Sequence, residues 1–310
     1  MKTNPIVQIQ AIDLPLLKEK GVQLFIQRDD TLHPHVSGNK WRKLKYNVLE
    51  AKQKGKTCLL TFGGAFSNHI AATAAAAQLA GMNSIGVIRG KDADPENSTL
   101  KFATSCGMQL QYVDRAEFRE LRASGWKGVE VGNSEAVYVL PEGGSNDLAV
   151  KGCKEITGDW KEHYDFACCA LGTGATFAGL VNGVSGDTHC LGFPAIKDQG
   201  YLSDEVSLFL EEPSRQNWEL IREYHFGKYG KVNADLINFM NDFYIKTGIP
   251  LDPIYTGKMI YGLIDMIKND YFNPGTKVIA IHTGGLQGNA GINMRLSKKG
   301  LQTLNYPISN

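Results

Sequence analysis

The sequence has almost no excess of charge of either sign, and this limits the partners that we expect for it. Its 310 residues include 33 lysines and arginines against 32 aspartates and glutamates, for a formal net charge of +1. Binding to nucleic acid or to an anionic membrane surface depends on an accumulation of basic charge. We therefore expect neither nucleic acid nor a membrane among the partners.

Long apolar segments and paired cysteines are also missing. No stretch approaches the roughly 20 apolar residues that a membrane-spanning helix needs, and the N-terminal MKTNPIVQIQAID lacks the apolar core of a signal peptide. The six cysteines form no Cys-x-x-Cys pair, and four lie in apolar runs such as TCLLTF and DFACCAL. Free cysteine packs like a small apolar residue, so we expect reduced core cysteines and a cytoplasmic protein.

Several common catalytic motifs are absent as well. Without a Gly-x-Ser-x-Gly segment, the serine nucleophile turn of the α/β-hydrolases is excluded. No carboxylate or cysteine cluster completes a metal site with His33 and His35, which we interpret as part of a loop. His282 lies in an apolar run, where a hydrogen-bonded core histidine is more common than a catalytic base.

What the sequence contains is an alternation of short apolar runs with helical patterns. The segments TCLLTF, DFACCAL and TKVIAIHTGG are almost wholly apolar, whereas SNHIAATAAAAQLAG and GKMIYGLIDMIKND have helical periodicity. Continuous apolar strands between helices are typical of parallel sheets that are covered on both faces. We therefore predict an α/β fold, and the length suffices for two domains. Residues 197–248 are less regular, and they fit either a surface segment with a packed aromatic cluster or a cover over the active site.

Three glycine-rich turns follow predicted strands, where open α/β sheets bind their ligands. LGTGATFAGL (171–180) can offer successive backbone N–H groups and a helix N-terminus to a phosphate. It lacks the Gly-Lys-Ser/Thr end of a nucleotide-binding P-loop, and Phe177 breaks the dinucleotide-binding spacing. A site for a lone phosphate group and an ordinary turn without ligand both stay open.

The other two turns place polar side chains at the same predicted edge. FGGAFSNH puts Ser67, Asn68 and His69 at a helix start, where Ser67 could also be an ordinary N-cap. IHTGGLQG ends a buried strand at Thr283.

The segment SGNKWRKLKY places Lys40 close to the apolar face of a predicted helix. Burial lowers the pKa of a lysine and makes its amine a usable nucleophile. Lys43 and Lys45 are competing candidates, which we expect on a solvated face of that helix.

Six motifs together resemble those of the aminocyclopropane-carboxylate deaminase and D-cysteine desulfhydrase family, in the same order. They are SGNKWRKLKY, FGGAFSNH, LPEGGSN, LGTGATFAGL, LDPIYTGKMIYGLIDMI and IHTGGLQG, and they extend over nearly the whole chain. Members of this family are fold-type-II (tryptophan-synthase-β-like) pyridoxal-phosphate enzymes. The resemblance implies two domains, each an open, mostly parallel sheet wrapped by helices, with the cofactor in the cleft between them. We expect a large domain at residues 1–50 and 149–310 and a small domain at residues 51–148.

The resemblance also implies roles in binding the cofactor. Lys40 resembles the lysine that holds pyridoxal 5'-phosphate as a Schiff base, and Asn68 resembles the residue that hydrogen-bonds its phenolic oxygen. Tyr255 is similar to the tyrosine beside the cofactor ring. The phosphate cradle is expected at Gly172, Thr173, Gly174, Ala175 and Thr176.

Further roles concern the substrate. Ser67 resembles the hydroxyl that contacts the substrate carboxylate or assists proton transfer, and Asn68 and His69 are expected to bind substrate beside it. A second active-site tyrosine is expected near Tyr224. Ala71 stands where the family usually has arginine, which implies a different contact to the substrate carboxylate.

Two positions distinguish the subfamilies. The deaminases carry Tyr-Glu-Gly-Lys and His-Leu-Gly-Gly, whereas this chain has YTGK and HTGG, so Thr256 and Thr283 resemble the desulfhydrase pattern. Either threonine could contact the pyridine nitrogen. A neutral hydroxyl there implies a weak electron sink, which favours expulsion of a β-leaving group over transamination.

The activity that this resemblance implies is α,β-elimination and deamination of a small amino acid. We expect a homodimeric enzyme that converts D-cysteine into pyruvate, sulfide and ammonia. The alternatives are deamination of 1-aminocyclopropane-1-carboxylate to 2-oxobutanoate and ammonia, and elimination or racemisation of D-serine-type substrates. A non-catalytic protein that binds the cofactor or an amino acid is the alternative from another class.

Overall fold

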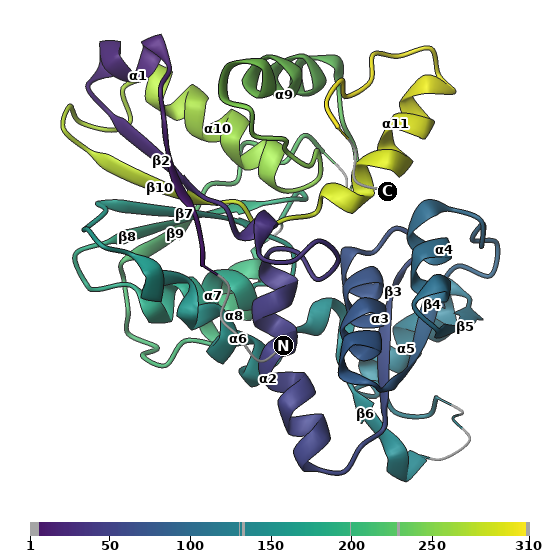
Figure 1. Cartoon of the computed structure of the whole chain (residues 1–310). Coiled ribbons are helices and arrows are strands. Elements are labelled where there is room, and N and C mark those ends of the chain that lie inside the picture. The colour runs from purple at the N-terminus through teal and green to yellow at the C-terminus, as the bar shows by residue number, and fades with distance from the viewer. Residues whose placement is uncertain (1–5, 130, 132–133, 199, 228–229, 308–310) are drawn as a thin grey trace.

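The fold is built on two separate sheets, each covered by helices (Figure 1). The computed structural model describes residues 6–129, 131, 134–198, 200–227 and 230–307. Strands of the smaller sheet all come from residues 58–139, and the segments before and after them supply the larger sheet. The predicted α/β class with mostly parallel sheets is confirmed.

The larger sheet has six strands in the order β1-β2-β10-β7-β8-β9. All neighbours are parallel except β1 and β2, which are antiparallel. The strands are β1 (Ile9–Ile12), β2 (Gln23–Gln27), β7 (Phe166–Leu171), β8 (His189–Pro194), β9 (Trp218–Leu220) and β10 (Lys277–Ile281).

Successive side chains of its central strands point into the hydrophobic cores on opposite faces of the sheet. In β10, Val278 and Ala280 pack with α1 (Pro15–Lys20), α9 (Ala234–Thr247) and α10 (Thr256–Lys268). Ile279 and Ile281 face the other way, toward α7 (Ala175–Gly183) and α8 (Tyr201–Ser207), with α6 (Asp147–Lys154) beside α7. Because side chains alternate across a strand, a strand that is buried on both faces must be apolar at every position.

The smaller sheet has four parallel strands in the order β5-β4-β3-β6. They are β3 (Cys58–Gly64), β4 (Asn83–Arg89), β5 (Met108–Val113) and β6 (Val137–Val139). The helices α3 (Asn68–Ala80) and α4 (Ser98–Ser105) pack on one face, and Phe118 of α5 (Arg115–Ala123) belongs to the core on the other face.

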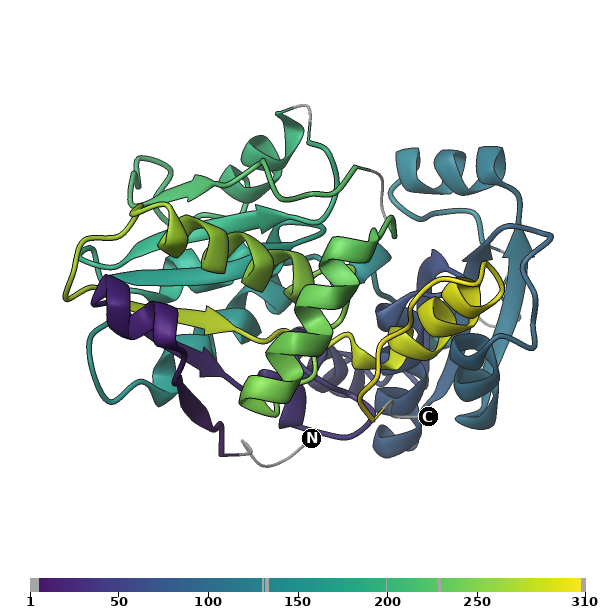
Figure 2. The ribbon, with the colours of Figure 1, turned by 90° about the horizontal axis from the view of Figure 1, so that it is seen from above.

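The helix α2 (Asn39–Gln53) joins the two parts. Trp41, Leu44 and Val48 pack against the alanine-rich side of α3. On its other side α2 meets α6 so closely that a Cβ atom at Gly152 would lie 2.0 Å from the carbonyl oxygen of Arg42. After β10, α11 (Asn289–Ser297) leaves the larger sheet and lies beside α4, as Figure 2 also shows. The predicted domain limits at residues 50/51 and 148/149 stay a prediction.

Several local predictions can be compared with the structure. All six cysteines are free and five are buried, as expected, while Cys106 is partly buried. His282 is a buried, hydrogen-bonded core residue, as expected, because its Nε2 lies 2.7 Å from the carbonyl oxygen of Pro250. His33 and His35 lie in a loop, where the His33 ring stacks on Trp41. No helix among the described residues has both the length and the apolarity needed to cross a bilayer.

Residues 197–248 hold α8, β9 and α9, together with a packed aromatic cluster. Phe226 and Phe239 both contact Tyr261 of α10, and Tyr224 packs against Phe193 and Tyr261. The described part of this segment therefore agrees with the first of its two interpretations.

Candidate active site

Lys40 lies at the first turn of α2, where three elements meet. Gly38 precedes the helix with φ +62°, and a Cβ atom there would lie 2.0 Å from the carbonyl oxygen of Thr283. The backbone N–H of Asn39 donates to that same oxygen at 3.2 Å. The start of α2 is thus held against the end of β10, which only glycine at position 38 allows.

The Asn39 side chain connects Lys40 to the glycine-rich turn after β7. Its Nδ2 donates to Oγ1 of Thr176 at 2.9 Å, and its Oδ1 accepts from Nζ of Lys40 at 3.1 Å. Burial of the Lys40 amine, reinforced by the positive charge of Lys43, lowers the pKa of Lys40 to about 7. A large fraction of Lys40 is therefore a neutral amine near neutral pH, as a nucleophile or a base requires.

The turn between β7 and α7 has the form of an anion site. Gly174 adopts φ +75° and precedes α7. The N–H of Ala175 donates to the carbonyl oxygen of Thr173 at 2.9 Å, whereas the next two amides of the first turn have no acceptor within the helix. Gly172 leaves room for Tyr255, since a Cβ atom at Gly172 would lie 3.2 Å from Cε1 of the Tyr255 ring. Backbone donors and the helix dipole here favour a negatively charged ligand.

The prediction that Lys43 lies on a solvated face of the helix is wrong, because the structure buries it. It is 2% exposed, and its Nζ donates to the carbonyl oxygen of Gly143, to Oγ of Ser145 and to Oγ1 of Thr173. Burial lowers the pKa of Lys43, and among the described residues no carboxylate pairs with it. A signal was present in the sequence, because a residue three positions after Lys40 lies on the same side of a helix.

Lys45, by contrast, extends toward the surface and pairs with Glu155 at 2.7 Å. A third buried lysine, Lys258, donates to the carbonyl oxygens of Ala195 and His225, at 2.8 and 2.9 Å. Burial lowers the pKa of Lys258 to about 8. Because its amine is occupied by two backbone acceptors, we assign Lys258 a structural role.

The start of α3 brings Ser67 and Asn68 to the carboxyl end of β3. Ser67 is the N-cap, and its Oγ accepts from the backbone N–H groups of His69 and Ile70 at 3.2 and 3.4 Å. Asn68 turns toward the loop after β10, where its Oδ1 accepts from Nε2 of Gln287.

His69 was expected to bind substrate, but its ring is buried between α3, to which it belongs, and the strand β3. It is 2% exposed, and its Nε2 lies 2.7 Å from Oγ1 of Thr61. Burial, together with the charges of Lys40 and Lys43, holds the pKa of His69 well below its usual range. A neutral, enclosed ring packs the helix and does not favour the predicted contact with substrate.

The N-terminus of α10 contributes Tyr255 and Thr256, which are held by a residue that the sequence interpretation missed. The buried carboxylate of Asp252 accepts from the backbone N–H of Tyr255 at 2.8 Å and from that of Thr256 at 2.9 Å. It also accepts the Thr256 hydroxyl at 2.7 Å. A Cβ atom at Gly285 would lie 2.9 Å from Cγ of Asp252, so the loop after β10 packs directly on this carboxylate.

Tyr224 is not part of this cluster, contrary to the sequence interpretation. Its hydroxyl donates to Oδ2 of Asp265 at 2.8 Å, and burial together with this carboxylate raises the pKa of Tyr224 to about 12. Asp265 stands nine residues after Thr256 in α10, which corresponds to about 14 Å along the helix axis. The structure therefore places Tyr224 toward the far end of α10, in the aromatic cluster.

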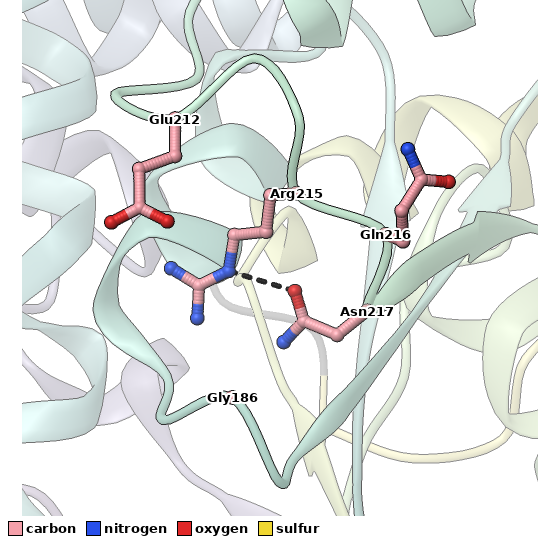
Figure 3. A pocket seen from close by; sticks show the side chains of 5 residues that line it. All are labelled: Gly186, Glu212, Arg215, Gln216 and Asn217. Carbon is pink, nitrogen blue, oxygen red and sulfur yellow. Dashed lines mark hydrogen bonds between the residues drawn. The ribbon is translucent and has the colours of Figure 1, made fainter.

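A separate surface cavity lies at the opposite end of the larger sheet. It has a volume of about 350 Å³ and is lined by Gly186, Glu212, Arg215, Gln216 and Asn217, which Figure 3 shows in close view. The Arg215 guanidinium donates to Oδ1 of Asn217 at 2.7 Å. These residues precede β8 and β9, whereas Lys40 and its neighbours lie where strands end, so the cavity is no part of the candidate site.

If the buried Lys43 ammonium serves an anionic ligand, its removal should weaken that ligand without unfolding the chain. We expect Lys43→Met to reduce affinity for pyridoxal phosphate about tenfold to a hundredfold, as for lost charged hydrogen bonds worth about 1.5–3 kcal/mol. A fluorescence titration of each variant with pyridoxal phosphate measures the dissociation constant. The matched control is Lys52→Met, on the exposed last turn of the same helix. Equal affinity of both variants would contradict the assignment.

Comparisons with known proteins show the family and the fold to which the chain is similar. Residues 2–284 match the family described as pyridoxal-phosphate dependent enzyme. The chain is 31% identical to the bifunctional D-cysteine desulfhydrase/1-aminocyclopropane-1-carboxylate deaminase of Arabidopsis thaliana, with 86% of the chain and 73% of that enzyme covered. It is 29% identical to the D-cysteine desulfhydrase of Klebsiella pneumoniae, with 88% and 90% covered. A crystal structure of an ACC deaminase homologue superposes with a TM-score of 0.79 at 28% identity, over 91% of this chain and 90% of that one.

Proposed function

From the premise that the chain belongs to the family of pyridoxal-phosphate-dependent enzymes, we propose that it releases sulfide and ammonia from D-cysteine and forms pyruvate. The observation that carries this proposal is the chemistry of Thr256 and Thr283. Both are neutral, and the nearby carboxylate of Asp252 is already occupied by backbone N–H groups and a hydroxyl. Within the described residues we find no free carboxylate here that could hold a proton on a ring nitrogen.

The donor set fits pyridoxal phosphate. We assign the phosphate to Lys43 and the first turn of α7, since a buried lysine that has no carboxylate partner among the described residues is suited to pair with an anion. We assign the aldehyde to Lys40 and the phenolic oxygen to Asn68. The Tyr255 ring lies between the phosphate turn and the start of α10, where it can support the cofactor ring. When bound, the cofactor accepts the electrons of the bond that breaks at the α-carbon.

Lys40 acts as the base in this proposal. An amine whose pKa is about 7 is substantially neutral at physiological pH and can take the α-proton of the substrate. Asn39 holds the amine at the start of α2. A lysine in water, with a pKa of about 10.4, would be almost wholly protonated under the same conditions.

Ser67 is better suited to bind the substrate carboxylate than to take a proton. A hydroxyl has two acceptor positions and one hydrogen. Both acceptor positions are used by the N–H groups of His69 and Ile70. The hydrogen is the remaining group that Ser67 can offer, and a carboxylate oxygen is a suitable acceptor. This contact could serve in place of the family arginine, whose position is taken by the buried Ala71.

Of the two threonines, we assign Thr283 the contact with the ring nitrogen. The Thr256 hydroxyl already donates to Asp252 and accepts from the Asp252 backbone N–H at 2.9 Å. No hydrogen bond of the Thr283 hydroxyl occurs in the part of the chain that the structure describes. The free hydroxyl hydrogen of Thr283 can be donated to an unprotonated ring nitrogen. The hydroxyl hydrogen of Thr256 cannot, because it is already donated to Asp252.

The two threonines can be separated by valine substitutions. Thr283→Val should lower kcat for elimination about tenfold, as for one lost hydrogen bond of about 1–1.5 kcal/mol in the transition state. The free energy of unfolding should not change. Thr256→Val should instead destabilise the fold by about 1–3 kcal/mol, because it leaves part of the Asp252 carboxylate unsatisfied. Steady-state kinetics and urea denaturation of both variants measure this. The reverse pattern would assign the nitrogen contact to Thr256.

The substrate is tested by a panel assayed for sulfide, pyruvate, 2-oxobutanoate and ammonia. We expect D-cysteine to give pyruvate and sulfide with the highest kcat/KM, ahead of L-cysteine and D-serine. The second candidate activity is deamination of 1-aminocyclopropane-1-carboxylate, which the name of the Arabidopsis relative also includes. Formation of 2-oxobutanoate from that acid, with no reaction of D-cysteine, would replace our proposal by this one. The expected homodimer and cytoplasmic location stay predictions.

A further inference from the structure

We propose that Gln287 is a positioning residue that fixes the orientation of the Asn68 amide toward the cofactor. Gln287 lies in the short 3₁₀ turn Leu286–Gly288 after β10, and it belongs to none of the roles assigned above. The proposal rests on the proposed contact between Asn68 and the phenolic oxygen of pyridoxal phosphate.

The observation is a relay of three polar side chains. The hydroxyl of Thr99, which is fully buried in α4, donates to Oε1 of Gln287 at 3.1 Å. Nε2 of Gln287 in turn donates to Oδ1 of Asn68. Each amide thus receives one hydrogen bond on its oxygen, and Gln287 passes one on through its nitrogen.

This relay determines which end of the Asn68 amide faces the cofactor. An asparagine amide has an acceptor end and a donor end, and rotation by 180° exchanges them. Because Gln287 occupies Oδ1, Asn68 has Nδ2 left to donate. In this arrangement the Thr99 hydroxyl donates to Oε1 of Gln287, which leaves Nε2 of Gln287 to donate to Asn68. An N–H donor stabilises an ionised phenolic oxygen, whereas a carbonyl oxygen in its place would repel it.

The loop geometry supports this role. Gly284 and Gly285 adopt φ +83° and +95°, conformations that residues with a side chain rarely take. A Cβ atom at Gly285 would lie 3.1 Å from Nδ2 of Asn68, so the backbone approaches the amide closely. The loop follows β10 of the larger sheet, while Asn68 and Thr99 belong to helices of the smaller one. The orientation of Asn68 therefore depends on contact between the two parts of the molecule.

The test uses the holoenzyme and follows the visible absorbance of the bound cofactor against pH, together with its dissociation constant. Gln287→Met keeps the side-chain length but removes both hydrogen bonds. We expect the midpoint of the absorbance titration to rise by about one unit and the cofactor affinity to fall about tenfold. Gln287→Glu can only accept from Asn68, so it should turn the amide and raise the midpoint further. Thr99→Val should shift the midpoint in the same direction by less, and Gln302→Met, at an exposed position, should leave it unchanged.

A double-mutant cycle separates this inference from the proposed function. If Gln287 acts through Asn68, adding Gln287→Met to Asn68→Ala should cause no further shift. Independent, additive shifts would overturn the positioning role, as would a Gln287→Met enzyme with the midpoint and affinity of the parent. If Asn68→Ala itself leaves both quantities unchanged, the proposed contact of Asn68 fails, and the inference falls with it.

Discussion

Lys40→Ala is expected to abolish the visible absorbance of the covalently held cofactor and to lower kcat by roughly 10²- to 10⁴-fold, the usual contribution of a positioned base. Lys40 has the geometry for both functions. Its amine lies at the start of α2, fixed by Asn39, beside the turn that carries Thr176. No other lysine among the described residues combines a lowered pKa with this position, because Lys43 is directed at the turn after β7 and Lys258 at backbone carbonyl oxygens. Absorbance spectra and steady-state kinetics measure the two effects.

The rate at which Lys40 captures the cofactor is expected to depend on pH. The Lys40 pKa of about 7 means that its amine is protonated below that pH and neutral above it. The cofactor-free enzyme should therefore capture pyridoxal phosphate faster as pH rises from 6 to 8, with the half-maximal rate near pH 7. Lys52→Ala, on the exposed end of α2, serves as the control and should behave like the parent enzyme.

For the absorbance test, an unchanged visible band in the Lys40→Ala enzyme would exclude Lys40 as the residue that holds the cofactor covalently.

The second large effect is expected for stability. Asp29→Ala should lower the free energy of unfolding by about 3–5 kcal/mol, because it removes the carboxylate that Arg42 hydrogen-bonds and leaves the buried charge only the more distant, exposed Asp159, at 3.9 Å. Asp29 is fully buried, and the Arg42 guanidinium donates to both of its carboxylate oxygens, at 2.6 and 3.0 Å. Nε2 of Gln27 adds a third hydrogen bond at 2.9 Å. Since Arg42 lies in α2 between Lys40 and Lys43, this network also holds both lysines in place.

Urea denaturation of the variant measures this loss, with Asp242→Ala as a control. Asp242 pairs with Lys246 on the exposed side of α9, and such a pair contributes only about 0.3–0.5 kcal/mol. A combined Asp29→Leu and Arg42→Met variant should recover much of the stability, because no unpaired charge stays buried. A loss in Asp29→Ala no larger than the control would show that the ion pair contributes little.

Sequence motifs located the part of the site that depends on local chain geometry. Gly38, Asn39 and Lys40 are neighbours in sequence, so their placement at the first turn of one helix follows from the backbone of that segment. The strands of the larger sheet were visible for a similar reason, because burial on both faces makes all residues of β7, and those of β10 after Lys277, apolar. The N-cap role of Ser67, one of the two interpretations of that residue, is also a local feature.

Residues whose function depends on contacts between distant segments were not found in this way. Lys43 was interpreted as solvated because its polar partners, Gly143, Ser145 and Thr173, come from other parts of the chain. Asp252 and Gln287 lie in two of the six motifs, but the motif letters do not reveal their contacts with Thr256 and Asn68. Tyr224 shows a different limit. The family resemblance implied a second active-site tyrosine near this position, whereas the structure places Tyr224 beside Asp265, toward the far end of α10.

The sequence by itself determined the class of fold and the family, and it singled out the lysine that we propose holds the cofactor, because each depends on short-range patterns of apolar residues, glycines and motif letters. Only the tertiary structure decided which polar groups are still free to act. A hydroxyl or amide can donate each hydrogen once, and whether that hydrogen is already taken depends on which residues the packing of the two sheets brings within about 3 Å of it.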